Sequence, residues 1–193
     1  NLNTASRNGI IYHQSTGNTH YLRANANTVA TDSATRFNDT SPTTAQFTVG
    51  TENVVNQDGK LMICYAWANS GPYAFGNYTG NGNADGTFIN VGGRPQVFCG
   101  KPTTSADSWV AKYDALLGYN VNGTRMFWQA TNAVSTSTSD GLVDFISTGV
   151  KNRISSTGLN SSTYGNYIYM AFGIKPLTDG AINQGRASRD GRG

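Results

Sequence analysis

Short runs of β-branched and aromatic residues, separated by glycine and asparagine turns, dominate the middle of this chain. In residues 75–95 the dipeptides Asn81-Gly82 and Asp85-Gly86 suit the positive φ angles of tight turns. Phe75 and Tyr78 precede these turns, and the run 87–91 follows them. Turn residues between two such runs predict a strand, a loop and a second strand joined as a hairpin.

The composition favours strands over helices. Good helix formers are scarce, and Glu52 is the only glutamate among 193 residues. Threonine, serine, asparagine and glycine are abundant, while charged residues make up 13% of the chain, so hydroxyl and amide groups must solubilise the surface. The length allows one domain or two small ones with a sizeable core. We therefore predict an all-β protein.

Residues 61–67 form the clearest predicted strand of the first half. One of its faces carries Leu61, Ile63, Tyr65 and Trp67, and the other carries Met62, Cys64 and Ala66. Because both faces are largely apolar, we expect a central strand that is covered on both sides. Residues 167–172 are the counterpart of this strand in the second half. Further short strands are predicted at 10–12, 47–49, 97–99, 109–113, 125–128, 143–146 and 150–154.

An internal repeat relates the two halves. Tyr65-Ala66-Trp67 is similar to Met170-Ala171-Phe172, and the runs 27–31 and 132–136 are related by the same offset of 105 residues. The repeat predicts a first β unit at 1–73, a second β unit at 74–175, and a polar tail or linker at 176–193. The first unit is incomplete because it lacks an opening hairpin. The missing strands would come from a removed segment or from a neighbouring chain.

The charge pattern argues against a nucleic-acid or membrane partner. The formal net charge is +3, and the arginines are scattered apart from those in the tail. A nucleic-acid-binding surface would place basic residues in a stripe with interleaved aromatic residues. No apolar run approaches the length that spans a membrane, and no signal-peptide pattern opens the chain. The polar, turn-like start is compatible with trimming of a longer precursor.

The central loop contains a weak candidate for a cation site. Asn81, Asn83 and Asp85 precede Gly86 with the oxygen spacing that opens a calcium loop. Only one of these residues is a carboxylate, and no acidic residue closes the loop at the twelfth position. An Asn/Gly turn is therefore the favoured interpretation, and neither a metal nor a cofactor is predicted.

The histidines and cysteines do not form a recognisable site in the sequence. His13 and His20 flank a polar loop with no third ligand nearby, which favours exposed strand-end histidines over a metal site. Cys64 and Cys99 both lie in apolar, strand-like runs. Two buried free thiols are the favoured interpretation, while a disulfide between them stays open.

No catalytic machinery is visible in the sequence. Serine is abundant, but no nucleophile elbow accompanies it. Glycosidase chemistry needs two carboxylates across a cleft, and with a single glutamate only aspartate pairs remain. Asp140 and Asp144 are four residues apart around a turn and could meet, although a turn residue and a strand-end residue explain them more simply. We therefore expect no enzymatic activity.

Aromatic and amide side chains around the central loop suggest a possible glycan contact. Tyr73 and Tyr78 could stack on sugar rings, while Asn81, Asn83 and Asp85 could bind sugar hydroxyl groups. The simpler alternative is that the aromatic residues pack the base of the predicted hairpin.

Several motifs along the chain resemble a repeat domain of bacteriophage tail-fibre and virion structural proteins, which is common in phages of marine bacteria. In the second half the resemblance is carried by residues 75–86, Gly93-Arg94-Pro95, Lys101, Trp109, Tyr113-Asp114, Asn160-Ser161-Ser162 and residues 167–172. In the first half it is carried by Tyr12-His13, Asn38-Asp39-Thr40, Pro42-Thr43, residues 47–50 and Tyr65-Ala66-Trp67. The resemblance covers nearly the whole chain to about residue 173.

The resemblance implies a lectin-like or jelly-roll antiparallel β-sandwich without catalytic residues. It also implies a non-enzymatic virion protein, located in the extracellular particle, that belongs to a tail fibre or similar appendage used in assembly and host-surface attachment. The expected partners are further copies of the chain, with a trimer favoured, other virion proteins and a host-surface glycan. A capsid decoration protein, a carbohydrate-binding module and a polysaccharide depolymerase are the alternatives.

Overall fold

The computed structural model of the chain describes residues 8–113, 126–127, 143–155 and 158–175. Regular structure in these residues consists of three antiparallel sheets and one single-turn helix, α1 (Ala34–Phe37). The prediction of an all-β, sandwich-like fold is therefore confirmed. In the described ranges, no helix has the length and apolar character needed to cross a membrane.

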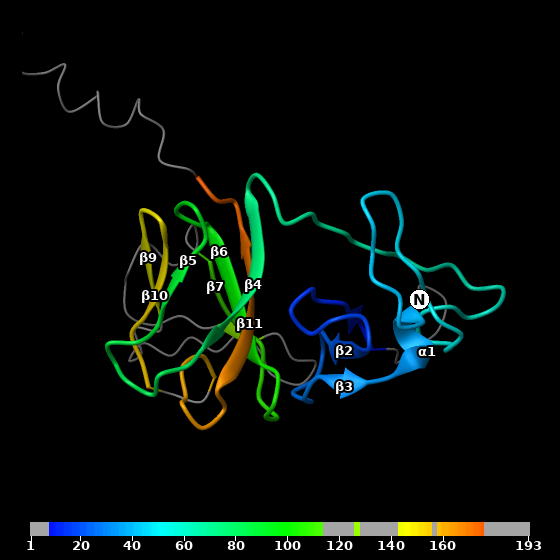
Figure 1. The fold of residues 1–193 in the computed structure, drawn as a ribbon, viewed down its shortest axis with the longest axis horizontal. Helices are drawn as coiled ribbons and strands as arrows, with labels where there is room; N and C mark the ends of the chain where they lie inside the picture. The colour runs from blue at the N-terminus through cyan, green and yellow to red at the C-terminus, as the bar shows by residue number, and fades with distance from the viewer. Residues whose placement is uncertain (1–7, 114–125, 128–142, 156–157, 176–193) are drawn as a thin grey trace, which may run out of the picture.

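A five-stranded antiparallel sheet lies in the middle of the molecule (Figure 1). In spatial order it contains β4 (Tyr73–Thr79), β11 (Asn166–Phe172), β6 (Val97–Pro102), β7 (Val110–Tyr113) and β8 (Met126–Phe127). The predicted strand at 167–172 is thus confirmed as β11, which has β4 on one side and β6 on the other. Tyr169 lies opposite Gly76 on β4 and opposite Gly100 on β6.

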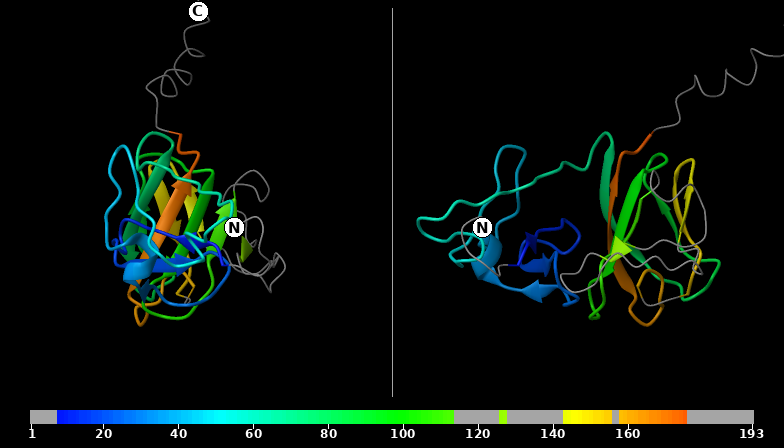
Figure 2. Two further views of the ribbon diagram at one scale, coloured as in Figure 1. Left: turned by 90° about the vertical axis from the view of Figure 1, so that its right-hand side faces the viewer. Right: turned by 180° about the vertical axis from the view of Figure 1, so that it is seen from behind.

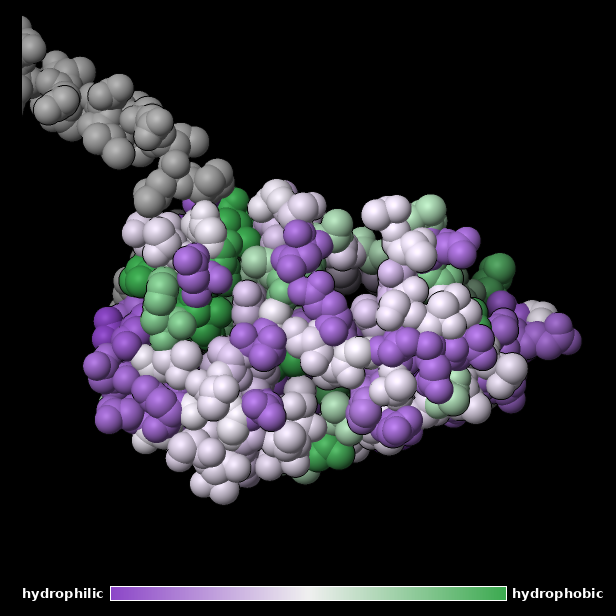
Figure 3. All heavy atoms as spheres, viewed as in Figure 1, coloured by the Kyte–Doolittle hydropathy of each residue, from purple (hydrophilic) through white to green (hydrophobic). Residues whose placement is uncertain are grey.

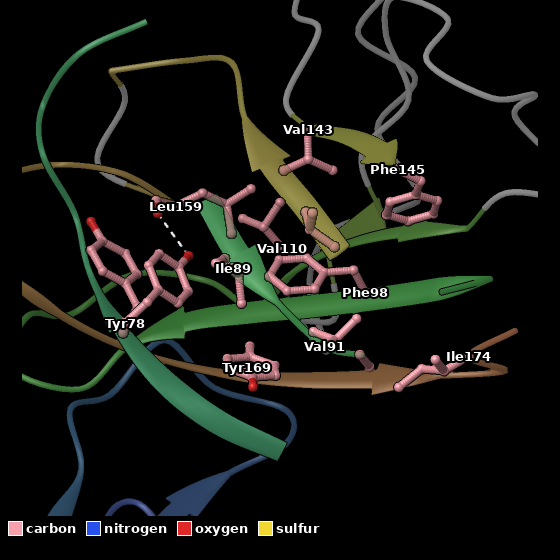
Figure 4. Close-up of a cluster of buried hydrophobic side chains, with 13 residues drawn as sticks. Tyr78, Ile89, Val91, Phe98, Val110, Val143, Phe145, Leu159, Tyr169 and Ile174 are labelled. Carbon is pink, nitrogen blue, oxygen red and sulfur yellow. Dashed lines mark hydrogen bonds between the residues drawn. The ribbon is translucent and has the colours of Figure 1, made fainter. Parts of the chain in front are cut away.

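A three-stranded sheet covers the inner face of the five-stranded sheet. It contains β5 (Phe88–Asn90), β10 (Gly149–Asn152) and β9 (Val143–Ile146), with β10 in the centre. The side chains between the two sheets form the larger hydrophobic core, which Figure 4 shows in close-up. Phe98, Phe145 and Val150 are among its most deeply buried members.

The predicted hairpin around the central loop is wrong. Both predicted strands exist, as β4 and β5, but β4 pairs with β11 while β5 pairs with β10. The intervening turns therefore carry the chain from one sheet across to the other. Turn chemistry gives the position of a loop, whereas strand pairing depends on residues far away in the sequence.

The first half of the chain covers the outer face of the five-stranded sheet. Its own sheet contains β1 (Ile10–Ile11), β2 (His20–Arg23) and β3 (Thr31–Asp32) in that order. Leu22 packs there with Trp109, whose indole Nε1 donates a hydrogen bond to the Arg23 carbonyl at 2.9 Å. Figure 2 shows the three resulting layers from the side. The division into units at residue 73 stays a prediction.

A cationic side chain joins α1 to the loop that follows it. Arg36 is buried and lies 2.8 Å from a carboxylate oxygen of Glu52, with its guanidinium 4.4 Å from the centre of the Tyr21 ring. Gly50 N also donates a hydrogen bond to the Arg36 carbonyl at 2.7 Å. These contacts attach residues 50–56 to the first-half sheet, although no strand forms at the predicted position 47–49.

The predicted central strand at 61–67 is also absent. These residues belong to a long extended connection that leads to β4 (Figure 1), and Leu61 and Tyr65 are 67% and 74% exposed. The prediction is wrong because a two-sided apolar strand needs a neighbour on each edge, and the described residues supply neither. Elsewhere the visible face is mainly polar, with separate small hydrophobic groups (Figure 3).

Candidate functional site

The side-chain amide of a buried asparagine stabilises the central loop. Asn160 is fully buried, and its Nδ2 lies within 3 Å of three acceptors, Asn81 Oδ1, Asn83 O and Ile154 O. Its Oδ1 accepts a hydrogen bond from the Asn81 backbone N–H at 3.1 Å. The positive φ of Gly82, 66°, allows the chain to turn over this side chain. The loop is therefore held in one shape by a residue 79 positions away.

A lysine pairs with the single carboxylate of the loop. Lys151 Nζ lies 2.7 Å from Asp85 Oδ1 and donates to the Gly86 carbonyl at 2.6 Å. The hydrogen bond and charge of Lys151 lower the pKa of Asp85 below its usual value. The side-chain oxygens of Asn81 and Asn83 accept hydrogen bonds from backbone N–H groups within the loop. These hydrogen bonds and the ion pair close the Asn/Gly turn.

The structure separates the residues that were predicted to contact a glycan. Asn81, Asn83 and Asp85 are exposed in the loop, but Tyr78 is only 7% exposed. Its ring stacks on Tyr167 with centroids 5.1 Å apart, so it cannot stack on a sugar from solvent.

The hydroxyl group of Tyr78 is also engaged in the core. It donates a hydrogen bond to the Leu159 carbonyl at 2.7 Å, drawn as a dashed line in Figure 4. Burial raises the pKa of Tyr78 well above its usual value. Tyr73 lies near the other end of β4, about 16 Å away by the rise of a strand. The five predicted residues therefore do not form one site.

Tyr73 instead belongs to an aromatic cluster around Phe172. The rings of Trp67, Tyr73 and Phe75 meet Phe172 edge to face at centroid distances of 5.5, 6.1 and 5.6 Å, respectively. Tyr65 stacks on Trp67 at 6.1 Å. Sequence reasoning missed the cluster because its members come from three segments. The alternation of aromatic residues at 65, 67, 73 and 75 was the available signal.

An open pocket of about 420 Å³ lies where the first half meets the five-stranded sheet. Its lining consists of Ser15, Thr16, His20, Val29, Ala30, Thr103 and Thr104. The hydroxyl groups of Thr16 and Thr104 donate to the backbone carbonyls of His13 and Tyr164, which leaves their lone pairs as acceptors. A rim of hydroxyl and imidazole groups suits a ligand rich in hydroxyl groups. No local motif indicates this pocket, because its lining residues are up to 89 positions apart.

His13 is not the exposed strand-end residue that was predicted. It is 3% exposed, with Nε2 3.0 Å from the Tyr169 carbonyl and Nδ1 accepting from the Ser15 N–H at 3.1 Å. A carbonyl can only accept, so His13 is a neutral imidazole that carries its proton on Nε2. Burial lowers its pKa. Within the described ranges, no three His, Cys, Asp or Glu side chains gather as metal ligands.

The two thiols are free and differ in their surroundings. Cys99 is buried in β6, and burial raises its pKa to about 12, whereas Cys64 is exposed. The prediction of a buried thiol is thus confirmed for Cys99 and wrong for Cys64, and no disulfide joins them. Cys64 lies in the same unpaired segment whose strand prediction is wrong.

Several carboxylates in the described residues are held in ion pairs with basic side chains. Asp144 binds Arg153, Glu52 binds Arg36, and Asp85 binds Lys151. Asp140, which could pair with Asp144 according to the sequence, lies outside the described residues.

Comparison with known proteins places the chain in a family. No curated protein and no solved structure matches it. A model of a domain of unknown function, DUF7483, matches residues 1–176. Since that match covers nearly the whole chain, the protein belongs to the DUF7483 family.

Proposed function

We propose that this chain is a non-enzymatic structural protein of a bacteriophage virion, in a tail fibre or similar appendage that acts in assembly and host-surface attachment. The proposal starts from the resemblance of its motifs to phage virion repeat domains. In that role the chain would be part of an extracellular particle, as a homo-oligomer in contact with other virion proteins.

One observation carries the structural role: four motif residues of the second half are buried and hold the fold together. Asn160 supports the central loop, Tyr78 stacks on Tyr167, and Trp109 anchors the first half through Arg23. Lys101 is buried, and its Nζ donates to the Asp107 carbonyl. None of these residues lines the open pocket. Motif residues that stabilise the fold are expected in a structural protein, whereas an enzyme places such residues in a cleft.

The ion pairs support the same proposal over a depolymerase. Cleavage of a glycosidic bond needs an acid and a second carboxylate on opposite sides of the sugar. Asp85, Asp144 and Glu52 each lie beside a basic partner from the protein itself. The hydrogen bond and charge of Lys151 also lower the pKa of Asp85, which makes this carboxyl group a poorer general acid at neutral pH.

The test is to locate the chain in the particle. Antibodies against the purified chain are applied to virions of the phage that encodes it, and the particles are imaged by electron microscopy. Labels on fibres or another tail appendage would support the proposal, while an even array on the head would favour the capsid decoration alternative. Virions that carry no label, and whose dissociated proteins lack this chain by mass spectrometry, would refute a structural role.

A carbohydrate-binding function is the second candidate, and the hydroxyl-lined pocket favours it. A glycan array probed with the intact chain would identify a ligand, and His20→Ala should then weaken binding because the imidazole lies in the pocket. Phe88→Ala is the matched control, since Phe88 is exposed on β5 in the opposite layer. Release of reducing ends from a bound glycan would instead indicate a depolymerase. An array without hits would count against this candidate.

A further inference from the structure

Residues 61–67 are an extended segment without strand partners. Within the described chain, none of their backbone groups forms a hydrogen bond with another backbone group. Leu61, Ile63, Tyr65 and Trp67 are 67%, 53%, 74% and 49% exposed, respectively. A row of large apolar side chains on an unpaired, extended backbone is a template for pairing with another strand.

The internal repeat identifies what this segment corresponds to. At the offset of 105 residues it aligns with β11, with Ile63 on Ile168 and Ala66 on Ala171 as identical pairs. In β11 the residue equivalent to Ile63 is 1% exposed because β4 and β6 flank the strand and side chains cover both faces. The sequence of 61–67 is thus suited to the same central position.

Among the described residues, one edge of β1 has no strand partner, which indicates the same neighbour. Tyr21-Leu22 in β2 aligns with Met126-Phe127 in β8 at the offset of 105. Leu22 pairs with Ile11 of β1 and Phe127 pairs with Val110 of β7, so by strand pairing β1 corresponds to β7. The other edge of β7 pairs with β6, whereas β1 is the outermost strand of its sheet. A strand equivalent to β6 would therefore pair with β1 on one edge and with 61–67 on the other.

A third unpaired run is consistent with this assignment. Residues 47–49 carry an apolar pattern but form no strand, and Phe47 is 52% exposed. In chain order they correspond to the region of β10, whose partner β5 lies between β4 and β6 in sequence. Within the part of the chain that the structure describes, residues 61–67, the outer edge of β1 and residues 47–49 thus each lack a strand partner. In the second half, the corresponding partners all come from the segment that runs from β4 to β6.

We infer that residues 61–67 are an acceptor strand for a segment with the pattern of residues 73–102, joined to the N-terminal side of β1 in the same polypeptide. The placement follows from connectivity, because only residues 103–109 separate β6 from β7, the counterpart of β1. Trp67 would then lie opposite the equivalents of Tyr73 and Val97, as Phe172 does. This inference is independent of the proposed virion role.

A second copy of the chain is a less suitable strand partner for residues 61–67. Each chain holds one segment of the β4-to-β6 type, and both of its long strands already pair with its own β11. Donating that segment to a neighbour would leave β11 unpaired in the donor. Exchange of this segment between two copies would therefore not increase the number of paired strands.

The experiment adds the proposed segment. A copy of residues 73–102, with Cys99→Ala in the copy, is fused directly before Asn1, and the unextended chain is compared with it. Cys64 is exposed and Cys99 is buried, so a thiol reagent reports on the acceptor strand. We expect labelling of Cys64 to slow by roughly tenfold or more and the amides of 62–67 to gain protection from hydrogen exchange. The amides of β11 serve as the internal measure of correct folding.

The matched control carries the same extension with proline in place of Phe75 and Phe98 in the added copy, which blocks ladder pairing. Cys64 in this control should react as fast as in the unextended chain.

Unchanged labelling and exchange in the extended chain would overturn the inference. So would protection of 62–67 in the unextended chain together with a dimer or trimer mass by light scattering. If the fusion loses β11 protection, the peptide 73–102 is added to the unextended chain, and unchanged Cys64 labelling at saturating peptide would equally overturn it.

Discussion

Asn160 and Asn81 join the two ends of the second half through their side-chain amides. Nδ2 of Asn160 lies 2.8 Å from Oδ1 of Asn81, while Oδ1 of Asn160 accepts from the Asn81 backbone N–H at 3.1 Å. The Gly82 N–H also donates to the Asn160 carbonyl at 2.7 Å. The loop between β4 and β5 therefore owes its shape to a buried residue in the segment before β11.

Asn160→Ala should destabilise the protein by about 2–3 kcal/mol, because it removes the four hydrogen bonds made by a fully buried side chain. The measurement is the free energy of unfolding from urea titrations. Asn77→Ala is the control, since that amide is exposed on β4, and it should change the free energy by less than about 0.5 kcal/mol. Equal effects of the two substitutions would show that Asn160 is not the support of the loop.

Tyr78→Phe should cost about 1–2 kcal/mol of stability and leave any glycan binding unchanged. The substitution keeps the stacked ring but removes the hydroxyl group that binds the buried Leu159 carbonyl. Tyr65→Phe, at a 74% exposed position, should have almost no effect. Unfolding titrations measure both variants. Loss of glycan binding in Tyr78→Phe without loss of stability would place Tyr78 in a site rather than in the core.

Stability should decrease as the pH falls below about 6.5, and His13 should account for part of the slope. Burial lowers the pKa of His13 from its ordinary value of 6.5, so the unfolded chain binds a proton at a pH where the folded chain does not. The loss begins near pH 6.5 and is complete once the pH passes the lower, folded-state pKa. Protonation of Nδ1 would also break its hydrogen bond with Ser15.

Urea titrations between pH 5 and pH 7.5 measure this slope. His13→Gln should flatten it between pH 6.5 and the folded-state pKa, while His20→Gln leaves the contribution of His13 in place. Parallel curves for the unmodified chain and His13→Gln would contradict the assignment of a buried neutral imidazole.

The strands that could be predicted are those whose partners lie within the described chain. The run 167–172 became β11 because β4 and β6 meet both of its edges. The equally apolar run 61–67 did not, because hydrophobic pattern describes what a strand can bury and not whether neighbours exist. The hairpin prediction was wrong for a related reason: a turn does not determine which sheet the next strand joins.

The candidate sites depend even more on distant residues. Asn81, Asn83 and Asp85 could be identified as a loop, but the loop chemistry is decided by Lys151 and Asn160, which no local motif connects to it. The open pocket combines hydroxyl groups from separate segments. Short motifs therefore gave the position of the central turns and of β11, whereas strand partners and the partners of polar side chains depend on the fold.

Millimolar calcium should not raise the melting temperature beyond the effect of matched ionic strength. Asn81 Oδ1 and Asn83 Oδ1 already accept hydrogen bonds from N–H groups, and Asp85 Oδ1 lies 2.7 Å from Lys151 Nζ. A cation would have to displace an ammonium group and break these bonds for one carboxylate. Binding at 100 times the dissociation constant would stabilise the folded state by about 2.7 kcal/mol, which corresponds to a shift of several degrees. Thermal unfolding with calcium chloride, with sodium chloride at equal ionic strength and with a chelator decides the matter. A calcium-specific rise that Asp85→Asn abolishes would restore the loop as a cation site.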